Sequence, residues 1–131
     1  MNNKLDKIFT EISAGELFDK ITILEIKKAK ISDKKKLSDI TKELTSLNIT
    51  MKKFIPNQDK ILHLINDLKE INLKLWDIED GKRAAEKNNN FDEKFIELAR
   101  NVYKFNDTRA GIKLKINDAL GSNIKEVKSY E

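Results

Sequence analysis

The residues with the clearest potential for chemistry lie between positions 103 and 117, where polar side chains recur at helical spacing. In a helix this polar row borders Arg109, whose guanidinium, with a nearby lysine, could form charge-assisted hydrogen bonds to a phosphate or carboxylate. A solvent-facing stripe of such a chain would instead be mostly Lys and Glu. The row therefore predicts a groove for a small polar or anionic molecule, lined by Tyr103, Asn106, Asp107, Arg109, Lys113 and Asn117. The alternative is a polar network between helices.

Arg109 itself interrupts an apolar row that runs from position 95 to 119. If the last two predicted helices fold back on each other, Arg109 comes level with Glu70. A charge pair inside such a hairpin fixes the register of the two helices more than it stabilises them. We expect an ion pair between Arg109 and Glu70, with a ligand-binding role for Arg109 as the alternative. Gly111, which is unfavourable in a helix interior, would permit the close approach of a neighbouring helix or of a ligand.

Two pairs of carboxylates have the i, i+3 spacing that places both side chains on one face of a helix. If the helices that carry the two pairs pack side by side, the carboxylates could share a divalent cation, since magnesium and calcium prefer oxygen ligands. Exposed salt bridges are the simpler interpretation, and we expect no cofactor. The four residues are Glu16, Asp19, Asp77 and Asp80.

The chain lacks the residue sets that mark most enzymes. It contains no cysteine, which excludes thiol catalysis, disulfides and thiolate metal sites. Its one histidine, His63, has only Asp67 as an acidic neighbour at helical spacing and is expected at the surface. Neither a Ser-His-Asp arrangement nor a glycine-rich phosphate loop can be assembled. Trp76 is expected to pack in the core or to wall the groove. The sequence leaves open whether the protein is an enzyme.

The charge pattern argues against nucleic acids and membranes as partners. The net charge is +4, but 26 basic residues alternate with 22 carboxylates, whereas a nucleic-acid-binding surface clusters its basic residues. No run approaches the ~20 apolar residues of a membrane helix, and the amino terminus lacks the apolar block of a signal peptide. We therefore expect a cytoplasmic protein.

Apolar residues recur at spacings of three and four along most of the chain, which predicts an all-α fold. A capping box, SAGE, opens the first helix, with Ser13 bonding the Glu16 amide and Glu16 reaching back. Gly15 inside this box leaves the first amides open to an anion, or is simply tolerated at a helix start. Asn90 is expected to cap the fourth helix and Gly121 to end it. The prediction is a single four-helix bundle-like domain over residues 1–131, with two shorter N-terminal helices and a long C-terminal antiparallel hairpin. The helices cover residues 14–31, 33–54, 58–87 and 91–120, and an extended tail covers 121–131.

The unequal helix lengths bear on function. The first two helices should be about 27 to 32 Å long and the last two about 45 Å, so part of the hairpin's apolar row would lie in water. We expect a homodimer, or a partner helix, to cover it. The function that we favour is a non-enzymatic helical interaction or oligomerisation domain. The alternative is an enzyme or binding protein for a phosphorylated or nucleotide-sugar small molecule, held by the polar row of the last helix.

The chain resembles a family of small all-helical bacterial and phage proteins, known only as a domain of unknown function. The resemblance implies a helical fold and names no activity and no catalytic residue. The polar row falls inside one of the matching stretches. There are four of them, in order: SAGELFDKITILEIK (13–27), LWDIEDGKR (75–83), FIELARNVYKFNDTRAGIKLKIN (95–117) and GSNIKEVKSY (121–130).

Overall fold

The computed structural model describes residues 4–128, and this part of the chain is helical and contains no strand. The predicted all-α fold is confirmed, and the helix bounds agree with the predicted ones within a few residues. The last three residues of the predicted tail lie outside the described part. The elements are α1 (Ala14–Lys30), α2 (Lys34–Phe54), the 3-10 turn η1 (Asp59–Ile61), α3 (Leu62–Lys87) and α4 (Glu93–Leu120).

The helix ends follow local capping chemistry. Ser13 Oγ accepts a hydrogen bond from the Glu16 amide at 3.1 Å, as the capping box predicts. The reciprocal half of the box does not form, because the Glu16 carboxylate bonds to Lys113 instead of reaching back to Ser13. The predicted cap of α4 is wrong by two residues, because Asp92 rather than Asn90 accepts from two amides of the first turn. Gly121 ends α4 as predicted, in the left-handed conformation that glycine adopts without strain.

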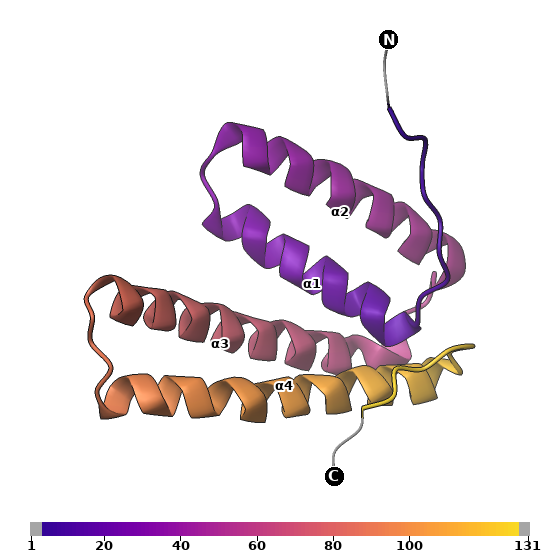
Figure 1. Ribbon diagram of the computed structural model, residues 1–131. Helices are drawn as coiled ribbons and strands as arrows, with labels where there is room; N and C mark the ends of the chain where they lie inside the picture. Colours follow the sequence, from indigo (N-terminus) through magenta and orange to yellow (C-terminus); the bar gives the residue numbers. More distant parts are fainter. Residues whose placement is uncertain (1–3, 129–131) are drawn as a thin grey trace.

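The four helices form two antiparallel hairpins that lie on each other (Figure 1). Helix α1 is the central element, because it contacts α2, α3 and α4. Helix α2 packs on α1 and makes no comparable contact with α3 or α4. The arrangement is bundle-like, as predicted, but α2 forms an outer layer instead of completing a symmetric four-helix core.

Two apolar clusters hold these layers together. Each buried leucine, isoleucine or phenylalanine contributes roughly 1.5 to 3 kcal/mol relative to an exposed position. The cluster between α1 and α2 consists of Leu17, Ile21, Leu24, Ile40 and Leu44. The cluster between α1, η1, α3 and α4 consists of Phe18, Ile61, Leu64, Leu68, Ile71 and Ile116.

The α1–α2 hairpin covers only part of the longer α3–α4 hairpin (Figure 1). The last buried residue of α3 is Ile78, and no residue of α4 before Lys113 is buried. We call residues 79–104 the distal half of the hairpin. The length mismatch that the sequence predicts is therefore present, with helices of 17 and 21 residues lying on helices of 26 and 28.

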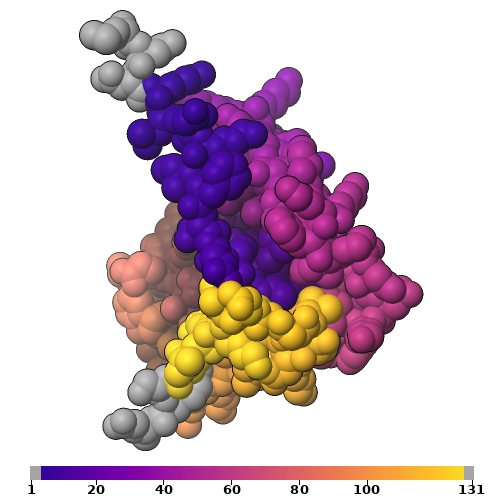
Figure 2. Space-filling view, turned by 90° about the vertical axis from the view of Figure 1, so that its right-hand side faces the viewer, coloured from indigo at the N-terminus to yellow at the C-terminus, as the bar shows by residue number. Residues whose placement is uncertain are grey.

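The residues just before α1 and those just after α4 lie together at the start of α1. Figure 2 shows the C-terminal segment against the residues that lead into α1. Ser122 Oγ accepts a hydrogen bond from the Ala14 amide at 3.1 Å, and Asn123 Nδ2 donates one to Glu11 at 2.6 Å. Within residues 4–128, no helix has the length and apolar character required to cross a membrane.

Candidate functional site

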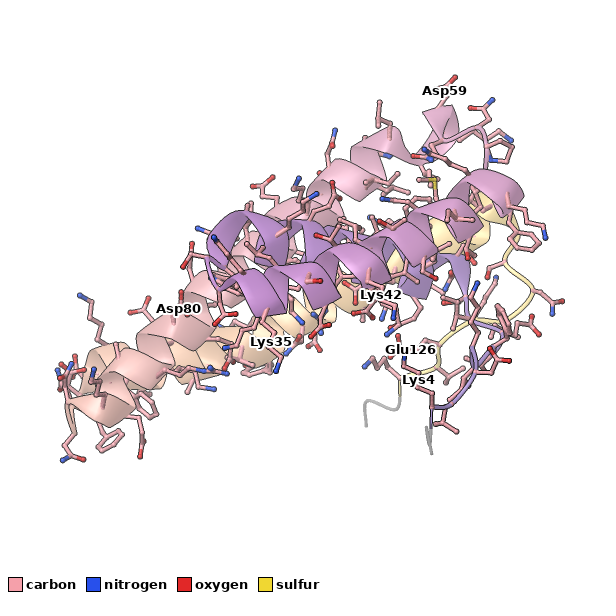
Figure 3. The ribbon with its side chains drawn as sticks, turned by 90° about the horizontal axis from the view of Figure 1, so that it is seen from above. Lys4, Lys35, Lys42, Asp59, Asp80 and Glu126 are labelled. Atoms are coloured by element: carbon pink, nitrogen blue, oxygen red, sulfur yellow. The ribbon has the colours of Figure 1, made fainter. Side chains whose placement is uncertain are left out.

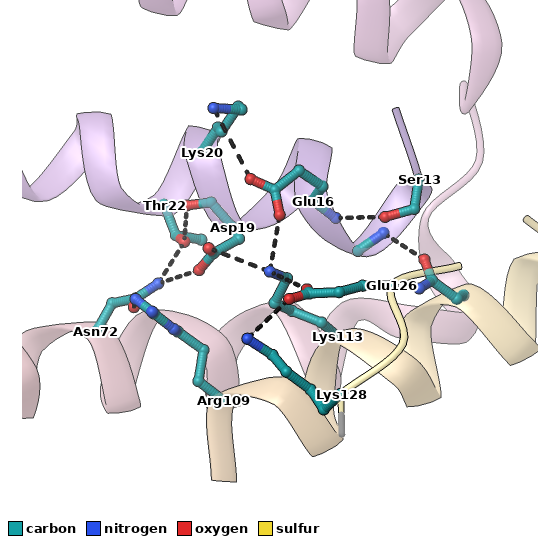
Figure 4. A network of polar contacts seen from close by, with 12 residues as sticks. Ser13, Glu16, Asp19, Lys20, Thr22, Asn72, Arg109, Lys113, Glu126 and Lys128 are labelled. Carbon is teal, nitrogen blue, oxygen red and sulfur yellow. Dashed lines mark hydrogen bonds and ion pairs between the residues drawn. The ribbon is translucent and has the colours of Figure 1, made fainter. Parts of the chain in front are cut away.

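A polar network joins α1, α3, α4 and the C-terminal segment, and Lys113 lies at its centre (Figure 4). The Lys113 ammonium lies 2.7 Å from a carboxylate oxygen of Glu16, 2.8 Å from one of Glu126 and 3.8 Å from one of Asp19. The side chains of Lys113 and Asp19 are only 10% and 7% exposed. Two buried opposite charges thus lie together, with further carboxylates at the rim, as burial of an ammonium requires.

Neutral side chains extend this network towards α3. Asn72 Nδ2 lies 2.9 Å from Asp19 Oδ1 and 3.0 Å from Thr22 Oγ1. The Thr22 hydroxyl donates to the Asp19 backbone carbonyl at 2.9 Å. Arg109 reaches the other side of the same amide, with 3.3 Å between Nη1 and Asn72 Oδ1 (Figure 4). The network therefore connects Lys113 to Arg109 through Asp19 and Asn72.

The amino end of α1 is closed to an external anion, so the prediction made from Gly15 is wrong. The Gly15 amide donates to Asn117 Oδ1 at 2.7 Å, and the amides on either side donate to Ser122 and Ser13. These bonds use the donors that an uncapped helix start would offer. Asn117 thus acts as a cap for a neighbouring helix.

Gly15 is needed here for space rather than for access. A Cβ atom at Gly15 would lie 2.5 Å from the backbone carbonyl oxygen of Lys113. The absence of a side chain lets the two backbones approach closely enough for the Asn117 contact. Gly111, in contrast, has no atom within 4 Å of its Cβ position, so no helix of the described chain approaches it.

The four predicted metal-binding carboxylates do not combine into one site. Glu16 and Asp19 face the Lys113 ammonium, which takes the position that a cation would need. Asp77 and Asp80 are exposed. Figure 3 shows Asp80 on α3, far from Glu126, which is one of the carboxylates around Lys113. Among residues 4–128 no three His, Cys, Asp or Glu side chains are grouped as metal ligands.

The predicted polar row does line hollows on the outer side of α4. A hollow of about 400 Å³ is lined by five of the six predicted ligand-binding residues, together with Lys128 of the C-terminal segment. The sixth, Asn117, lines an adjoining hollow of about 470 Å³. Lys113 and Asn117 already bond to α1, as the network alternative anticipates. The five residues that meet in the first hollow are Tyr103, Asn106, Asp107, Arg109 and Lys113.

The expected ion pair between Arg109 and Glu70 does not form. Glu70 is 69% exposed and lies 3.7 Å from Lys74, while Arg109 bonds to Asn72. Two residues along a helix correspond to a rotation of about 200°, so Asn72 faces the opposite side of α3 from Glu70. The predicted level along the hairpin is right within two residues, and the predicted face of α3 is wrong.

The carboxylates around Lys113 affect its pKa and that of Glu126. Burial alone lowers the pKa of Lys113, but hydrogen bonds with Glu126 and Glu16 and the charge of Asp19 outweigh it, so the pKa is raised above 10.5. Hydrogen bonds from Lys113 and then Lys128 lower the pKa of Glu126 from 4.5 to about 2. Both shifts favour the charged forms. The ion pair between Glu126 and Lys113 joins the C-terminal segment to α4.

We expect Glu126→Gln to lose this stabilisation in a pH-dependent way. A depressed folded-state pKa stabilises the fold above pH 4.5, and that stabilisation disappears as the pH falls from 4.5 towards 2. Glu126 is about a third exposed, so a loss of roughly 0.5 to 1 kcal/mol at pH 7 is expected. Urea unfolding of both proteins between pH 7 and pH 2 measures it. A difference that stays constant down to pH 3 would contradict the ion pair.

The fold and the network define a class of protein: an all-helical domain whose helices are joined by a buried polar network. Within that class, the chain belongs to the family of unknown function DUF6165, whose model matches residues 8–131. The predicted membership of a domain family of unknown function is thereby confirmed. No curated protein and no solved structure matches the chain.

Proposed function

We propose that the protein is a helical interaction domain that pairs with a second copy of itself through the distal half of the α3–α4 hairpin. The observation that carries this proposal is the absence of a buried residue in that half, although it belongs to the two longest helices. An apolar row left against only one neighbouring helix favours a further partner. The half-buried residues of this row include Phe95, Leu98 and Val102.

The charges of the distal half support a second copy as the partner. Residues 79–104 contain six basic and six acidic side chains, whereas the whole chain carries a net charge of +4. Two copies can therefore meet there without net repulsion, and in a two-fold interface each contact between residues of unlike charge would occur twice. Three large side chains also stand exposed in or beside the two helices: Phe91, Ile96 and Tyr103.

The proposal predicts that Ile96→Glu converts the dimer to a monomer. Ile96 is 53% exposed in the single chain, so the change removes little from the fold but places a charge in the interface. We expect the dimer dissociation constant to rise at least about tenfold, measured by sedimentation velocity over a concentration series.

The matched control is Ile49→Glu on α2. Ile49 is 64% exposed and lies on the outer helix layer, away from the distal half. The control should dimerise as the unchanged protein does. Equal weakening by both variants would show that the association is non-specific, and weakening by the control alone would place the interface on α2.

A second candidate function is the binding of a phosphorylated or nucleotide-sugar small molecule. The observation that favours it is the gathering of Tyr103, Asn106, Asp107 and Arg109 around one hollow of about 400 Å³. Lys113 is less suited to bind the anion because three carboxylates already surround it. Arg109 therefore remains the candidate anion-binding residue. A thermal-shift panel of sugar phosphates and sugar nucleotides, with and without magnesium, tests this candidate.

A further inference from the structure

A third hollow, of about 300 Å³, opens between α1, α3 and α4 on the other side of Arg109. Buried or half-buried apolar side chains of α1 and α3 form part of its wall, and Asn72 and Arg109 lie at one end. Its size is at the lower limit of ligand-binding cavities and suits a molecule with a single ring. The apolar wall residues are Ile23, Ile26, Leu75 and Trp76.

Arg109 has spare binding capacity at this hollow. Within residues 4–128, the guanidinium makes one hydrogen bond to another side chain, which is the 3.3 Å contact with the neutral Asn72 amide. No carboxylate of this part of the chain forms an ion pair with it. A guanidinium carries five N–H donors and accepts a phosphate or carboxylate in a two-pronged contact. The contact with Asn72 directs the guanidinium towards α3, and Arg109 lines this hollow as well as the outer hollow of α4.

The remaining polar residues of the hollow lie away from Arg109, along the same face of α3. Trp76 follows Asn72 by one turn and is half-buried, so one side of its ring can contact a ligand. Glu79 and Asp80 follow by about two turns, roughly 10 Å along the helix axis. These carboxylates accept hydrogen bonds from hydroxyl groups. Arg83, one turn beyond Glu79, is exposed and also lines this end of the hollow. The hollow thus presents the half-buried cation of Arg109, then an apolar ring face, then hydroxyl acceptors beside a second, exposed cation.

From this order we infer that the hollow binds a hydroxylated ring that carries one phosphate or carboxylate group, such as a monosaccharide phosphate or a sugar acid. The anionic group lies on Arg109, the ring lies against Trp76, and its hydroxyl groups donate to Glu79 and Asp80. This inference rests on the second candidate function but places the ligand on the α1–α3 side of Arg109. A whole nucleotide sugar would extend beyond the hollow of about 300 Å³.

Trp76 gives a direct test because it is the only tryptophan of the chain. The probes are glucose 6-phosphate, glucuronate and inorganic phosphate, each titrated into the full-length protein while Trp76 fluorescence and thermal stability are recorded. We expect a saturable fluorescence change with glucose 6-phosphate or glucuronate, and the stronger of the two identifies the anionic group. Inorganic phosphate, which has no ring, should bind at least about tenfold more weakly.

Arg109→Met should weaken the binding of the stronger probe at least about tenfold, because the charge-assisted hydrogen bonds are lost. Arg109→Lys keeps the charge without the planar fork and should have an intermediate effect. The second variant also keeps the test valid if Arg109→Met folds poorly. Arg100→Met is the matched control, since Arg100 is exposed on the same helix and does not line this hollow, and it should bind as the unchanged protein does.

Two results would overturn the inference, and they differ in whether the second candidate function is contradicted as well. A thermal shift without any change in Trp76 fluorescence, abolished by Asp107→Asn, would place the ligand in the outer hollow of α4 and leave the second candidate function standing. No saturable response to glucose 6-phosphate or glucuronate at 10 mM, about the upper end of useful metabolite affinities, would contradict the inference. If the wider nucleotide panel also failed, the second candidate function would fall with it.

Discussion

Replacing Gly15 with alanine is expected to destabilise the protein by about 3 kcal/mol. In an ordinary helix interior the same change adds up to about 1 kcal/mol of stability, so the expected sign is reversed. The reason is steric: the new Cβ would lie 2.5 Å from the Lys113 carbonyl oxygen and 3.0 Å from Asn117 Oδ1. A backbone carbonyl cannot rotate away, so α1 and α4 must separate and the 2.7 Å bond from the Gly15 amide to Asn117 is lost.

Gly111→Ala is the matched control for this prediction. Gly111 is exposed in the interior of α4, and no atom lies within 4 Å of its Cβ position. We expect it to raise the free energy of unfolding by up to about 1 kcal/mol, through helix propensity alone. Urea unfolding at pH 7 measures both variants. If Gly15→Ala were as stable as Gly111→Ala, the close approach of α1 and α4 would be wrong.

Lys113→Met is expected to lower the free energy of unfolding by about 3 kcal/mol. The methionine keeps most of the side-chain length but leaves Asp19, which is only 7% exposed, without its cation. Removing one partner of a buried ion pair costs about 3 to 5 kcal/mol. We expect the lower end of this range because the other two carboxylates around Lys113 can turn towards water.

A second change should recover much of this loss. Asp19→Asn in the Lys113→Met background removes the uncompensated charge, while its carbonyl oxygen can still accept the 2.9 Å hydrogen bond from Asn72. The exposed Lys115, two residues along α4, gives the control variant Lys115→Met, which should change stability by less than about 0.5 kcal/mol. A loss equal to that of the control would show that Lys113 is not part of a buried network.

The helices could be predicted from the sequence because their signals are local. A spacing of three and four residues depends only on the helix period, and a cap such as Ser13 acts within one turn. The error at the start of α4 has the same origin. Asn90 and Asp92 are both good capping residues, and the choice between them depends on where the turn after α3 ends.

The partner of Arg109 could not be predicted, because it depends on the rotation of α3 about its axis. Register along a hairpin follows from the position of the turn, and this placed Arg109 near the right level. The rotation is determined by how α1 packs on α3, where Asp19 and Thr22 hold Asn72. Asn72 adjoins the buried Ile71, but a polar residue beside an apolar row can face either the core or water.

The role of the C-terminal segment is also absent from the sequence pattern. Ser122 and Glu126 lie after the last helix, where no periodicity shows which side chains face the fold. Ser122 bonds to Ala14, at the opposite end of the chain, and Glu126 turns back to Lys113, 13 residues earlier. Gly15 was expected to leave the first amides of α1 open to an anion. Its lack of a Cβ also permits another helix to pack closely, and the position of α4 decides which of these two roles applies.

The central functional proposal, pairing through the distal half of the hairpin, is tested most directly by the mass of the unmodified protein in solution. Sedimentation equilibrium of the full chain at tens of micromolar, in buffer of physiological salt, gives this mass without a shape assumption. The proposal predicts a species of twice the chain mass of 15.2 kDa, which dissociates on dilution. A single species of 15.2 kDa at every concentration, with the distal half still helical, would contradict it.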